Sequence, residues 1–369
     1  MIRLMLLIPT LDRSGAEKQL TLLATRLPRE EFDVEVVCLT RGGPYAQELS
    51  QAGIPLTVLH KRFRCDPLAY WRLRQRLRRQ PPDVLQTWLF AANAYGRLAA
   101  GSRPRFPIIV SERCVDRWKA GWQLRLDRQL AGRTSRLIGN SQSVAEFYRE
   151  QGFPPERLGA IPNGMELPPR DLAGGTELRH ALGIPAGTKV VLYAGRLARQ
   201  KRVADLIWAF ELIRVMEGQV VFLIVGDGPE RSGLEEFTGK LGIADRVRFL
   251  GHRADVAQLL GVTDLFWLAS DFEGLSNSVM EAMAAGLPVV ASDIPPNREL
   301  VVPGETGYLA PVGDRVALAQ FAQKLLVDRE LAARLGAAGR ERIGREFSVE
   351  TMVEAYARLY RDVVTGVPD

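Results

Sequence analysis

Residues 270–288 read SDFEGLSNSVMEAMAAGLP, and this stretch decides the fold. Just before it, residues 263–269 (TDLFWLA) form a short apolar run that is typical of a buried strand. Residues 277–285 place apolar side chains at helical spacing among small residues, which predicts a helix. Between the two lies a turn, residues 271–276, that contains Gly274. The order strand, glycine turn and helix predicts one unit of a parallel α/β sheet.

This turn has the features of an anion site. A glycine lets backbone N–H groups approach a ligand closely, and the start of a helix carries partial positive charge. Together they favour binding of a phosphate. Two carboxylates flank the turn, Glu273 inside it and Glu281 about one turn into the helix. An ordinary turn with two solvated acids is the alternative interpretation.

The spacing Glu273–x7–Glu281, followed by AMAAGLPVVAS, resembles the signature of a known enzyme family. The family is that of the retaining, family-4-like glycosyltransferases with the GT-B fold (glycosyl transferases group 1), which use nucleotide sugars. The resemblance implies that Glu273 faces the donor sugar, that Glu281 binds the ribose, and that the turn binds the diphosphate. It also implies two Rossmann-like βαβ domains that face each other across a cleft.

Length and composition agree with a soluble protein of two domains. The chain has 369 residues, enough for two ordinary cores, and no apolar run is long enough to span a bilayer. The three cysteines and three histidines are scattered, so the sequence predicts no metal site and no disulfide framework. We therefore expect a cytoplasmic protein without a metal or other cofactor.

The charge is distributed unevenly along the chain. Residues 1–166 carry 26 Lys and Arg against 16 Asp and Glu, a balance of +10. The remaining residues carry 23 against 27, a balance of −4. The first half is therefore suited to an anionic partner: a membrane surface, an acidic acceptor or nucleic acid. No recognised nucleic-acid-binding module accompanies the charge, so we do not expect nucleic acid.

The basic charge is densest at residues 61–79, KRFRCDPLAYWRLRQRLRR. Tyr70, Leu73 and Leu77 share one face of a predicted helix, and arginines occupy the rest. A basic helix with aromatic residues can lie on anionic lipid, which predicts peripheral attachment to the inner face of the membrane. A helix that covers the sheet with a solvated outer face explains the same pattern.

Two further loops of the first half follow predicted strands and resemble acceptor-side loops of the family. They are residues 85–93 (LQTWLFAAN) and residues 111–118 (SERCVDRW). Many relatives have a histidine in this region, and this chain has none there. The predicted acceptor contacts are Glu112, Arg113 and Trp118.

Residues 195–201 (GRLARQK) follow a predicted strand and resemble the family element in which an arginine and a lysine hold the donor diphosphate. Positive charge at this position neutralises a departing nucleotide without a metal. We expect three catalytic residues: Glu273, Arg196 and Lys201. The predicted donor-binding residues are Gly15, Gly226, Asp227, Gly228, Arg253, Gly274, Leu275, Ser276 and Glu281.

The domain boundary is expected in a segment rich in Pro, Gly and Ala at residues 168–187. The predicted first domain is residues 1–166 on the acceptor side, completed by a C-terminal helix at 348–369 that returns to it. The second domain, residues 167–347, is predicted to bind the nucleotide sugar.

The resulting hypothesis is a retaining transfer of a hexosyl unit from a nucleotide sugar to an acceptor hydroxyl. UDP-sugars are favoured as donors and GDP-mannose is the next choice; the expected acceptor is a lipid-linked or polysaccharide intermediate of envelope glycan synthesis. Family members usually let the departing phosphate take the acceptor proton, which agrees with the lack of an obvious general base. The alternatives are a GT-B sugar-nucleotide epimerase, a phosphorylase, or a non-catalytic scaffold that binds nucleotide sugars.

Overall fold

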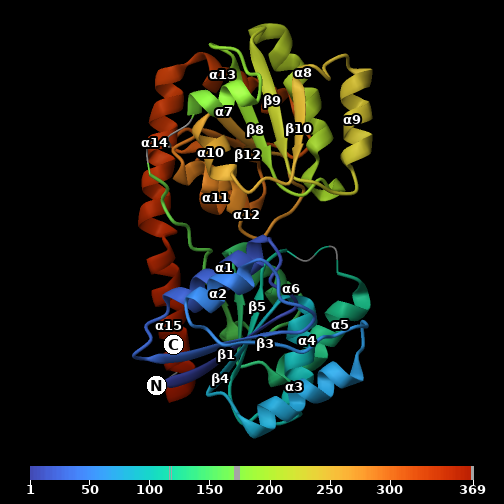
Figure 1. Cartoon of the computed structure of the whole chain (residues 1–369), viewed down its shortest axis with the longest axis vertical. Coiled ribbons are helices and arrows are strands. Elements are labelled where there is room, and N and C mark those ends of the chain that lie inside the picture. Colours follow the sequence, from blue (N-terminus) through green and yellow to red (C-terminus); the bar gives the residue numbers. More distant parts are fainter. Residues whose placement is uncertain (116, 118, 170–174, 367–369) are drawn as a thin grey trace. The chain divides into compact units, whose positions relative to one another are not determined.

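The computed structural model describes residues 1–115, 117, 119–169 and 175–366. The chain divides into two compact units (Figure 1). The first unit comprises Met1–Gly164 and Val349–Asp369, and the second comprises Met165–Ser348. Each unit contains one parallel sheet with helices packed against it, which confirms the predicted α/β class of two Rossmann-like domains.

The sheet of the first unit has seven strands in the order β3-β2-β1-β4-β5-β6-β7. Its strands are β1 (Ile2–Ile8), β2 (Phe32–Cys38), β3 (Leu56–Val58), β4 (Val84–Trp88), β5 (Ile108–Glu112), β6 (Arg136–Gly139) and β7 (Leu158–Ala160). The helices are α1 (Gly15–Arg26), α2 (Tyr45–Gln51), α3 (Pro67–Arg79), α4 (Leu89–Ala100), α5 (Gly121–Leu130), α6 (Gln142–Glu150) and α15 (Val349–Thr365), with 3-10 turns η1 (Ala131–Arg133) and η2 (Pro155–Arg157).

Strand β1 shows why this sheet is covered on both faces. Leu4, Leu6 and Ile8 belong to a core shared with α1, α2 and α15, whereas Met5 and Leu7 belong to a core shared with α3, α4 and α6. Successive side chains of a strand point to opposite faces, so an unbroken apolar run fits a strand that is buried on both sides.

Helix α15 packs in the first unit although it is the last element of the chain (Figure 1, red). Tyr356 and Tyr360 are fully buried, and the Tyr360 ring lies 5.8 Å from the ring of Phe32. The Tyr360 hydroxyl also donates a hydrogen bond to Gln86 Oε1 in β4. These contacts confirm the prediction that the C-terminal helix returns to the first domain.

The sheet of the second unit has six strands in the order β10-β9-β8-β11-β12-β13. Its strands are β8 (Lys189–Ala194), β9 (Val220–Val225), β10 (Val247–Gly251), β11 (Leu265–Leu268), β12 (Val289–Ser292) and β13 (Gly307–Ala310). The helices are α7 (Gly175–Ala181), α8 (Val203–Glu217), α9 (Arg231–Lys240), α10 (Val256–Gly261), α11 (Asn277–Ala284), α12 (Pro295–Leu300), α13 (Arg315–Val327) and α14 (Arg329–Glu346), with the 3-10 turn η3 (Arg199–Lys201).

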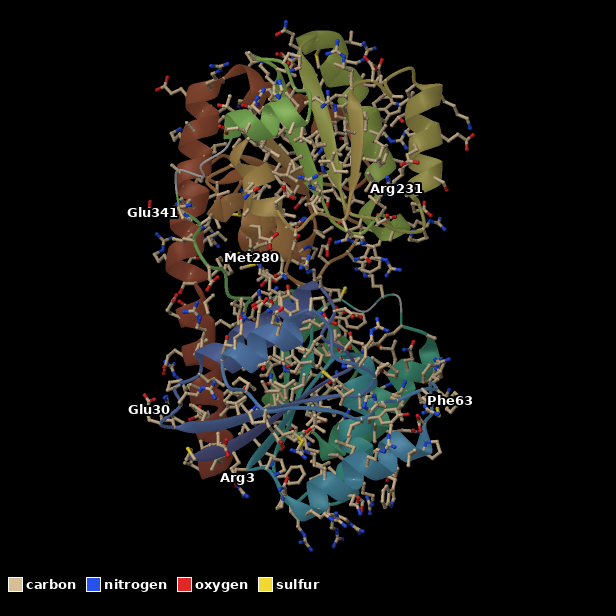
Figure 2. The ribbon with its side chains drawn as sticks, viewed as in Figure 1. Arg3, Glu30, Phe63, Arg231, Met280 and Glu341 are labelled. Carbon is tan, nitrogen blue, oxygen red and sulfur yellow. The ribbon has the colours of Figure 1, made fainter. Side chains whose placement is uncertain are left out.

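The element that opened the sequence analysis forms as predicted. Strand β11 is fully buried, and α11 begins after the N-cap residue Ser276, whose hydroxyl accepts from the Val279 N–H at 3.5 Å. Met280 of α11, labelled in Figure 2, lies in the core of the second unit. Helices α13 and α14 are separated at Asp328, whose side chain caps α14 at the Leu331 N–H, 2.9 Å away.

Candidate functional site

Apart from Gly15, the donor-side residues predicted from the sequence lie at one edge of the second sheet. They lie on the loops that follow β8, β9, β10 and β11, or at the start of the helix after β11. All strands of this sheet are parallel, so these loops leave from the same, carboxyl-terminal edge. Ligands of open α/β sheets bind at that edge.

Glu273 is the centre of this set. Its side chain is only 10% exposed, and its Oε1 atom accepts a hydrogen bond from Ser270 Oγ at 2.6 Å. The same oxygen contacts the ammonium of Lys201, which is 18% exposed. The other oxygen, Oε2, accepts no hydrogen bond from the residues that the structure describes. One carboxylate oxygen is therefore held by the protein, while the second is available to a ligand.

Arg196 lies in the same loop as Lys201 but differs from it in its surroundings. Its side chain is exposed, and within the described ranges it forms no ion pair. Arg253, in contrast, pairs with Asp255 at 2.6 Å. Of the two cations predicted to be catalytic in the loop after β8, Lys201 is bound to a carboxylate and Arg196 is exposed.

Two glycines of the loop after β9 are explained by close packing of backbones. A Cβ atom on Gly226, whose φ is +123°, would lie 2.0 Å from the carbonyl oxygen of Gly195. A Cβ atom on Gly228 would lie 2.3 Å from the carbonyl oxygen of Leu197. Leu197 N–H also donates to the Asp227 carbonyl at 2.9 Å. Only glycine allows the loops after β8 and β9 to pack this closely.

Asp227 itself is held within its own turn. Its carboxylate accepts from the Gly228 N–H at 2.7 Å and from Arg231 at 3.0 Å. The backbone N–H of Gly228 and the Arg231 guanidinium lower the pKa of Asp227 below its ordinary value. Glu281, the predicted ribose ligand, is partly buried on α11, and Gly274 and Leu275 are buried in the turn before that helix.

In the first unit, Gly15 begins α1 after β1. Ser14 takes the N-cap position with extended backbone angles (φ −145°), so a glycine is not needed there. Glu17 accepts hydrogen bonds from Ser14 Oγ and, at 3.3 Å, from Thr10 Oγ1. Burial raises the pKa of Glu17 above its ordinary value. The turn before α1 is therefore stabilised by the hydroxyls of Ser14 and Thr10, which both bind the Glu17 carboxylate.

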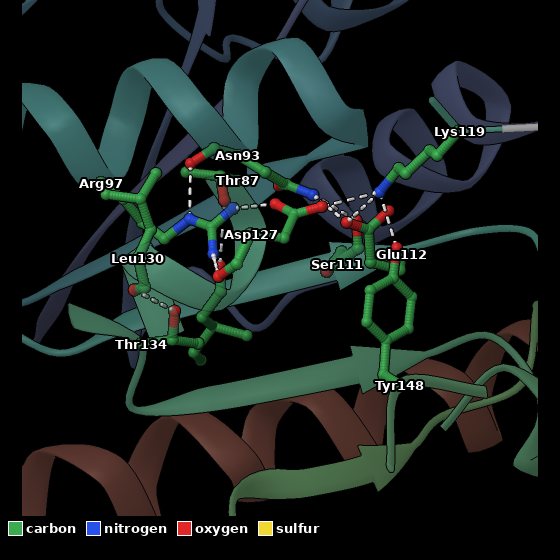
Figure 3. Close-up of polar contacts among 11 residues, drawn as sticks. Thr87, Asn93, Arg97, Ser111, Glu112, Lys119, Asp127, Leu130, Thr134 and Tyr148 are labelled. Carbon is green, nitrogen blue, oxygen red and sulfur yellow. Dashed lines mark hydrogen bonds and ion pairs between the residues drawn. The ribbon is translucent and has the colours of Figure 1, made fainter. Parts of the chain in front are cut away.

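Glu112 lies in a buried network of charged side chains (Figure 3). Its Oε1 atom accepts from Asn93 Nδ2 at 2.9 Å and from Lys119 Nζ at 3.0 Å. Lys119 also contacts Asp127 at 3.1 Å, and Asp127 contacts Arg97 at 2.5 Å. The side chains of Arg97 and Lys119 are 0% exposed, and those of Glu112 and Asp127 are 3% exposed. These four charges sum to zero, which is the condition for burying them.

Arg113, the next predicted acceptor contact, follows β5. Its guanidinium lies 4.6 Å from the ring centre of Trp88, donates to Tyr356 Oη at 3.3 Å and contacts Asn163. Arg113 thus joins the end of β4 to α15. Trp118 lies outside the described residues. A role of Glu112 or Arg113 in acceptor binding stays a prediction.

No group of three or more His, Cys, Asp or Glu residues among those that the structure describes could hold a metal ion. None of the helices in the described ranges is long and apolar enough to cross a membrane.

Comparisons with known proteins cover both units. A family model described as "Glycosyl transferases group 1" matches residues 175–342, and one described as "Glycosyltransferase Family 4" matches residues 13–167. The lipopolysaccharide core biosynthesis mannosyltransferase LpsB of Rhizobium meliloti (strain 1021) is 31% identical over 84% of each chain. This chain belongs to the group 1 glycosyltransferases.

Two further similarities fit this family. The N-acetyl-alpha-D-glucosaminyl L-malate synthase of Bacillus anthracis is 37% identical over 51% of this chain and 49% of its own, so the chain spans about half the length of that relative. The crystal structure of Anabaena HepE in complex with UDP and glucose has a TM-score of 0.88 and 26% identity, and it covers 98% of this chain and 100% of that chain. The GT-B fold predicted from the sequence is thereby confirmed.

Sequence reasoning missed several residues of this glycosyltransferase that the structure brings to the predicted sites. The sequence assigns no role to Ser270, yet its hydroxyl binds Glu273. Lys119, Asp127 and Arg97 carried no signal, because nothing in a sequence distinguishes a buried charge from a solvated one. Lys119 lies seven residues after Glu112, and this spacing alone does not predict that the two side chains contact each other in the folded protein.

Proposed function

We propose that this protein transfers a hexosyl unit from a nucleotide sugar to an acceptor hydroxyl, with retention of anomeric configuration. The observation that carries the proposal is the buried contact between Glu273 and Lys201 at the carboxyl edge of the second sheet. The exposed Arg196 lies in the same loop. A carboxylate and two cations at one edge match the two charges that develop when a glycosyl–phosphate bond breaks.

The cations and the carboxylate of this site stabilise opposite charges. Negative charge grows on the departing diphosphate, and Lys201 and Arg196 stabilise it by charge-assisted hydrogen bonds. Positive charge grows on the sugar ring, and the carboxylate of Glu273 offsets part of it. The unoccupied Oε2 atom of Glu273 is the acceptor we assign to a sugar hydroxyl.

Proton transfer in this scheme needs no protein base, because the departing phosphate takes the proton of the acceptor hydroxyl. A double displacement through a covalent sugar on Glu273 is the less favoured route. The contacts of Lys201 and Ser270 with Glu273 stabilise its carboxylate and lower its reactivity as a nucleophile.

For the donor we favour a UDP-sugar. The similarity to the HepE structure, which contains UDP and glucose, supports this choice. A mannosyl donor such as GDP-mannose is the second choice, supported by the name of the relative LpsB. We assign donor binding mainly to the second unit, with Gly15 as the one predicted donor residue of the first unit, and acceptor binding to the first unit.

A thermal-shift comparison tests the donor. UDP at about one hundred times its dissociation constant should raise the melting temperature by about 5–10 °C, because a ligand that binds only the folded state stabilises it. Arg196→Ala should reduce this rise, whereas Arg334→Ala, which removes an exposed arginine on α14, should not. No response to UDP, GDP or their sugar conjugates would contradict both a nucleotide-sugar enzyme and a scaffold that binds nucleotide sugars.

For the acceptor we propose a lipid-linked or polysaccharide intermediate of envelope glycan synthesis, met at the inner face of the membrane. Support comes from the surface of the first unit around residues 61–79. Phe63, Leu68 and Trp71 are more than half exposed, and Figure 2 labels Phe63 at the periphery of this unit. Apolar side chains among arginines match an anionic lipid surface.

The structure refines the prediction for this helix. Leu73 and Leu77 are buried against the sheet, as predicted, and Tyr70 packs beside them. Arg72 and Arg74 donate hydrogen bonds to the carbonyls of Leu59 and Ala99, and Arg76 pairs with Glu35. The exposed basic residues of the stretch are Arg62, Arg64, Arg72, Arg78 and Arg79.

Vesicle flotation tests this surface. We expect recovery with vesicles that contain an anionic phospholipid and little recovery with purely zwitterionic vesicles. Replacing both Leu68 and Trp71 by serine should reduce the recovered fraction several-fold, since apolar burial adds to the electrostatic attraction. The control is Val215→Ser, an apolar residue that is 69% exposed in the second unit. Equal recovery with both kinds of vesicle would contradict electrostatic docking.

A further inference from the structure

Three consecutive residues of the loop after β8 form hydrogen bonds and ion pairs with the turn that carries Glu273. Gln200 Nε2 donates to the Phe272 carbonyl at 2.6 Å, and the Gln200 carbonyl accepts from Asp271 N–H at 2.9 Å. Lys201 contacts the Glu273 carboxylate, and Arg202 pairs with Asp271 at 3.1 Å. The loop that carries the diphosphate cations and the turn that carries the sugar carboxylate are thus one connected structure.

A second set of contacts reaches Glu273 from the other side. Ser270 is fully buried, and its hydroxyl donates to Glu273 Oε1 at 2.6 Å. The Ser270 carbonyl accepts from Ser292 Oγ at 2.7 Å, and Asn297 Nδ2 donates to the Ser292 carbonyl at 2.8 Å. A buried chain of hydrogen bonds therefore runs from α12 through the end of β12 to the carboxylate.

We propose that Ser270 and Gln200 are positioning residues of Glu273: Ser270 orients its carboxylate, and Gln200 fixes the backbone of its turn. Ser270 binds the Oε1 atom of Glu273, and Gln200 binds the main chain of the turn. Neither contact occupies Oε2, which therefore stays available to the donor sugar. Ser270 becomes more important when a diphosphate attracts Lys201, because the serine then still holds Oε1. This inference rests on the function proposed above, in which Glu273 contacts the sugar.

Positioning of Glu273 should strengthen donor binding, because a carboxylate that is already ordered loses less conformational entropy when the sugar binds. Loss of a hydrogen bond to a charged group changes a binding constant by about tenfold to hundredfold. Without these contacts the Glu273 carboxylate would be mobile and would have to become ordered each time a donor binds. The conformational entropy lost in that step would lower the affinity for the sugar part of the donor. The nucleotide part would be unaffected.

The test compares binding of UDP and UDP-glucose by calorimetry in the wild type, Ser270→Ala and Gln200→Ala. We expect Ser270→Ala to weaken UDP-glucose binding about tenfold and to leave UDP binding within about twofold. Gln200→Ala should weaken UDP-glucose binding by a larger factor than UDP binding, because the turn that it fixes is also assigned to the diphosphate. The control is Thr263→Val, which removes a buried hydroxyl that donates to the Leu259 carbonyl at 2.7 Å before β11, at the other end of that strand. It should change neither constant.

A double-mutant cycle distinguishes positioning from a general loss of structure. If Ser270 acts through the Glu273 side chain, adding Ser270→Ala to Glu273→Ala, which removes that side chain, should not lower the UDP-glucose affinity further. Equal losses for UDP and UDP-glucose, or additive losses in the cycle, would overturn the inference and leave the proposed function intact. A wild type that binds neither compound nor any other nucleotide sugar would overturn the proposed function itself.

Discussion

Replacing Lys119 by methionine should lower the free energy of unfolding of the first unit by about 3–5 kcal/mol. Lys119 is fully buried and contacts Glu112 at 3.0 Å, Asp127 at 3.1 Å and Tyr148 Oη at 2.6 Å. With Arg97 these charges sum to zero, and methionine leaves a net charge of −1 in the interior. Removing one partner of a buried ion network costs much more than the network itself contributes.

Urea unfolding followed by circular dichroism measures this loss, fitted with a separate transition for each unit where two are resolved. The matched control is Lys240→Met, because Lys240 pairs with Glu236 at 2.6 Å but is 70% exposed. Exposed pairs contribute about 0–1 kcal/mol, so the control should stay near the wild type.

A second replacement, of Glu112, tests whether charge imbalance causes the loss of stability. Adding Glu112→Gln to Lys119→Met restores neutrality among these residues, since Arg97 and Asp127 still balance each other. The double variant should therefore recover part of the lost stability. A Lys119→Met loss no larger than that of Lys240→Met would contradict the network, as would a further loss in the double variant.

Replacing Glu273 by glutamine should lower the rate of sugar transfer by about 10²–10³-fold. Glutamine has the size of glutamate and keeps hydrogen-bonding groups beside Ser270 and Lys201. It lacks the negative charge that offsets the positive charge on the sugar ring. The loss should therefore appear in kcat more than in KM for the donor.

The measurement is the initial rate of UDP release from a saturating UDP-sugar donor in the presence of acceptor. The control is Glu236→Gln on α9, an exposed glutamate of the same unit that should keep the wild-type rate. Each variant is accepted only if its melting temperature stays close to that of the wild type. Unchanged kcat in Glu273→Gln would remove this residue from the mechanism.

The sequence alone predicted most of the architecture, because strands and helices of an α/β unit have local signatures. The unbroken apolar run of β1 predicts a strand that is covered on both faces, and the structure buries Met5 and Leu6 in two different cores. The break between α13 and α14 has a local cause as well, because Asp328 caps α14.

The candidate site was predictable only in part. The resemblance assigned roles to Glu273 and Lys201, but 72 residues separate them, and no periodicity indicates that their charged groups meet. Gly226 and Gly228 are predicted donor contacts. The structure gives a second reason for glycine at both positions, because a Cβ atom there would collide with the backbone of the neighbouring loop. Ser270 was overlooked, since a serine at the end of a strand is common.

What the sequence by itself determined is therefore the order of elements, the two α/β units and the family signature around Glu273. These follow from hydrophobic periodicity and turn chemistry, which act over a few neighbouring residues. Only the tertiary structure decided that Glu112, Lys119 and Asp127 form one buried network, and that Ser270 and Gln200 hold the turn of Glu273. The physical reason is that burial and pairing of a charge depend on groups far along the chain, which only folding brings within hydrogen-bonding distance.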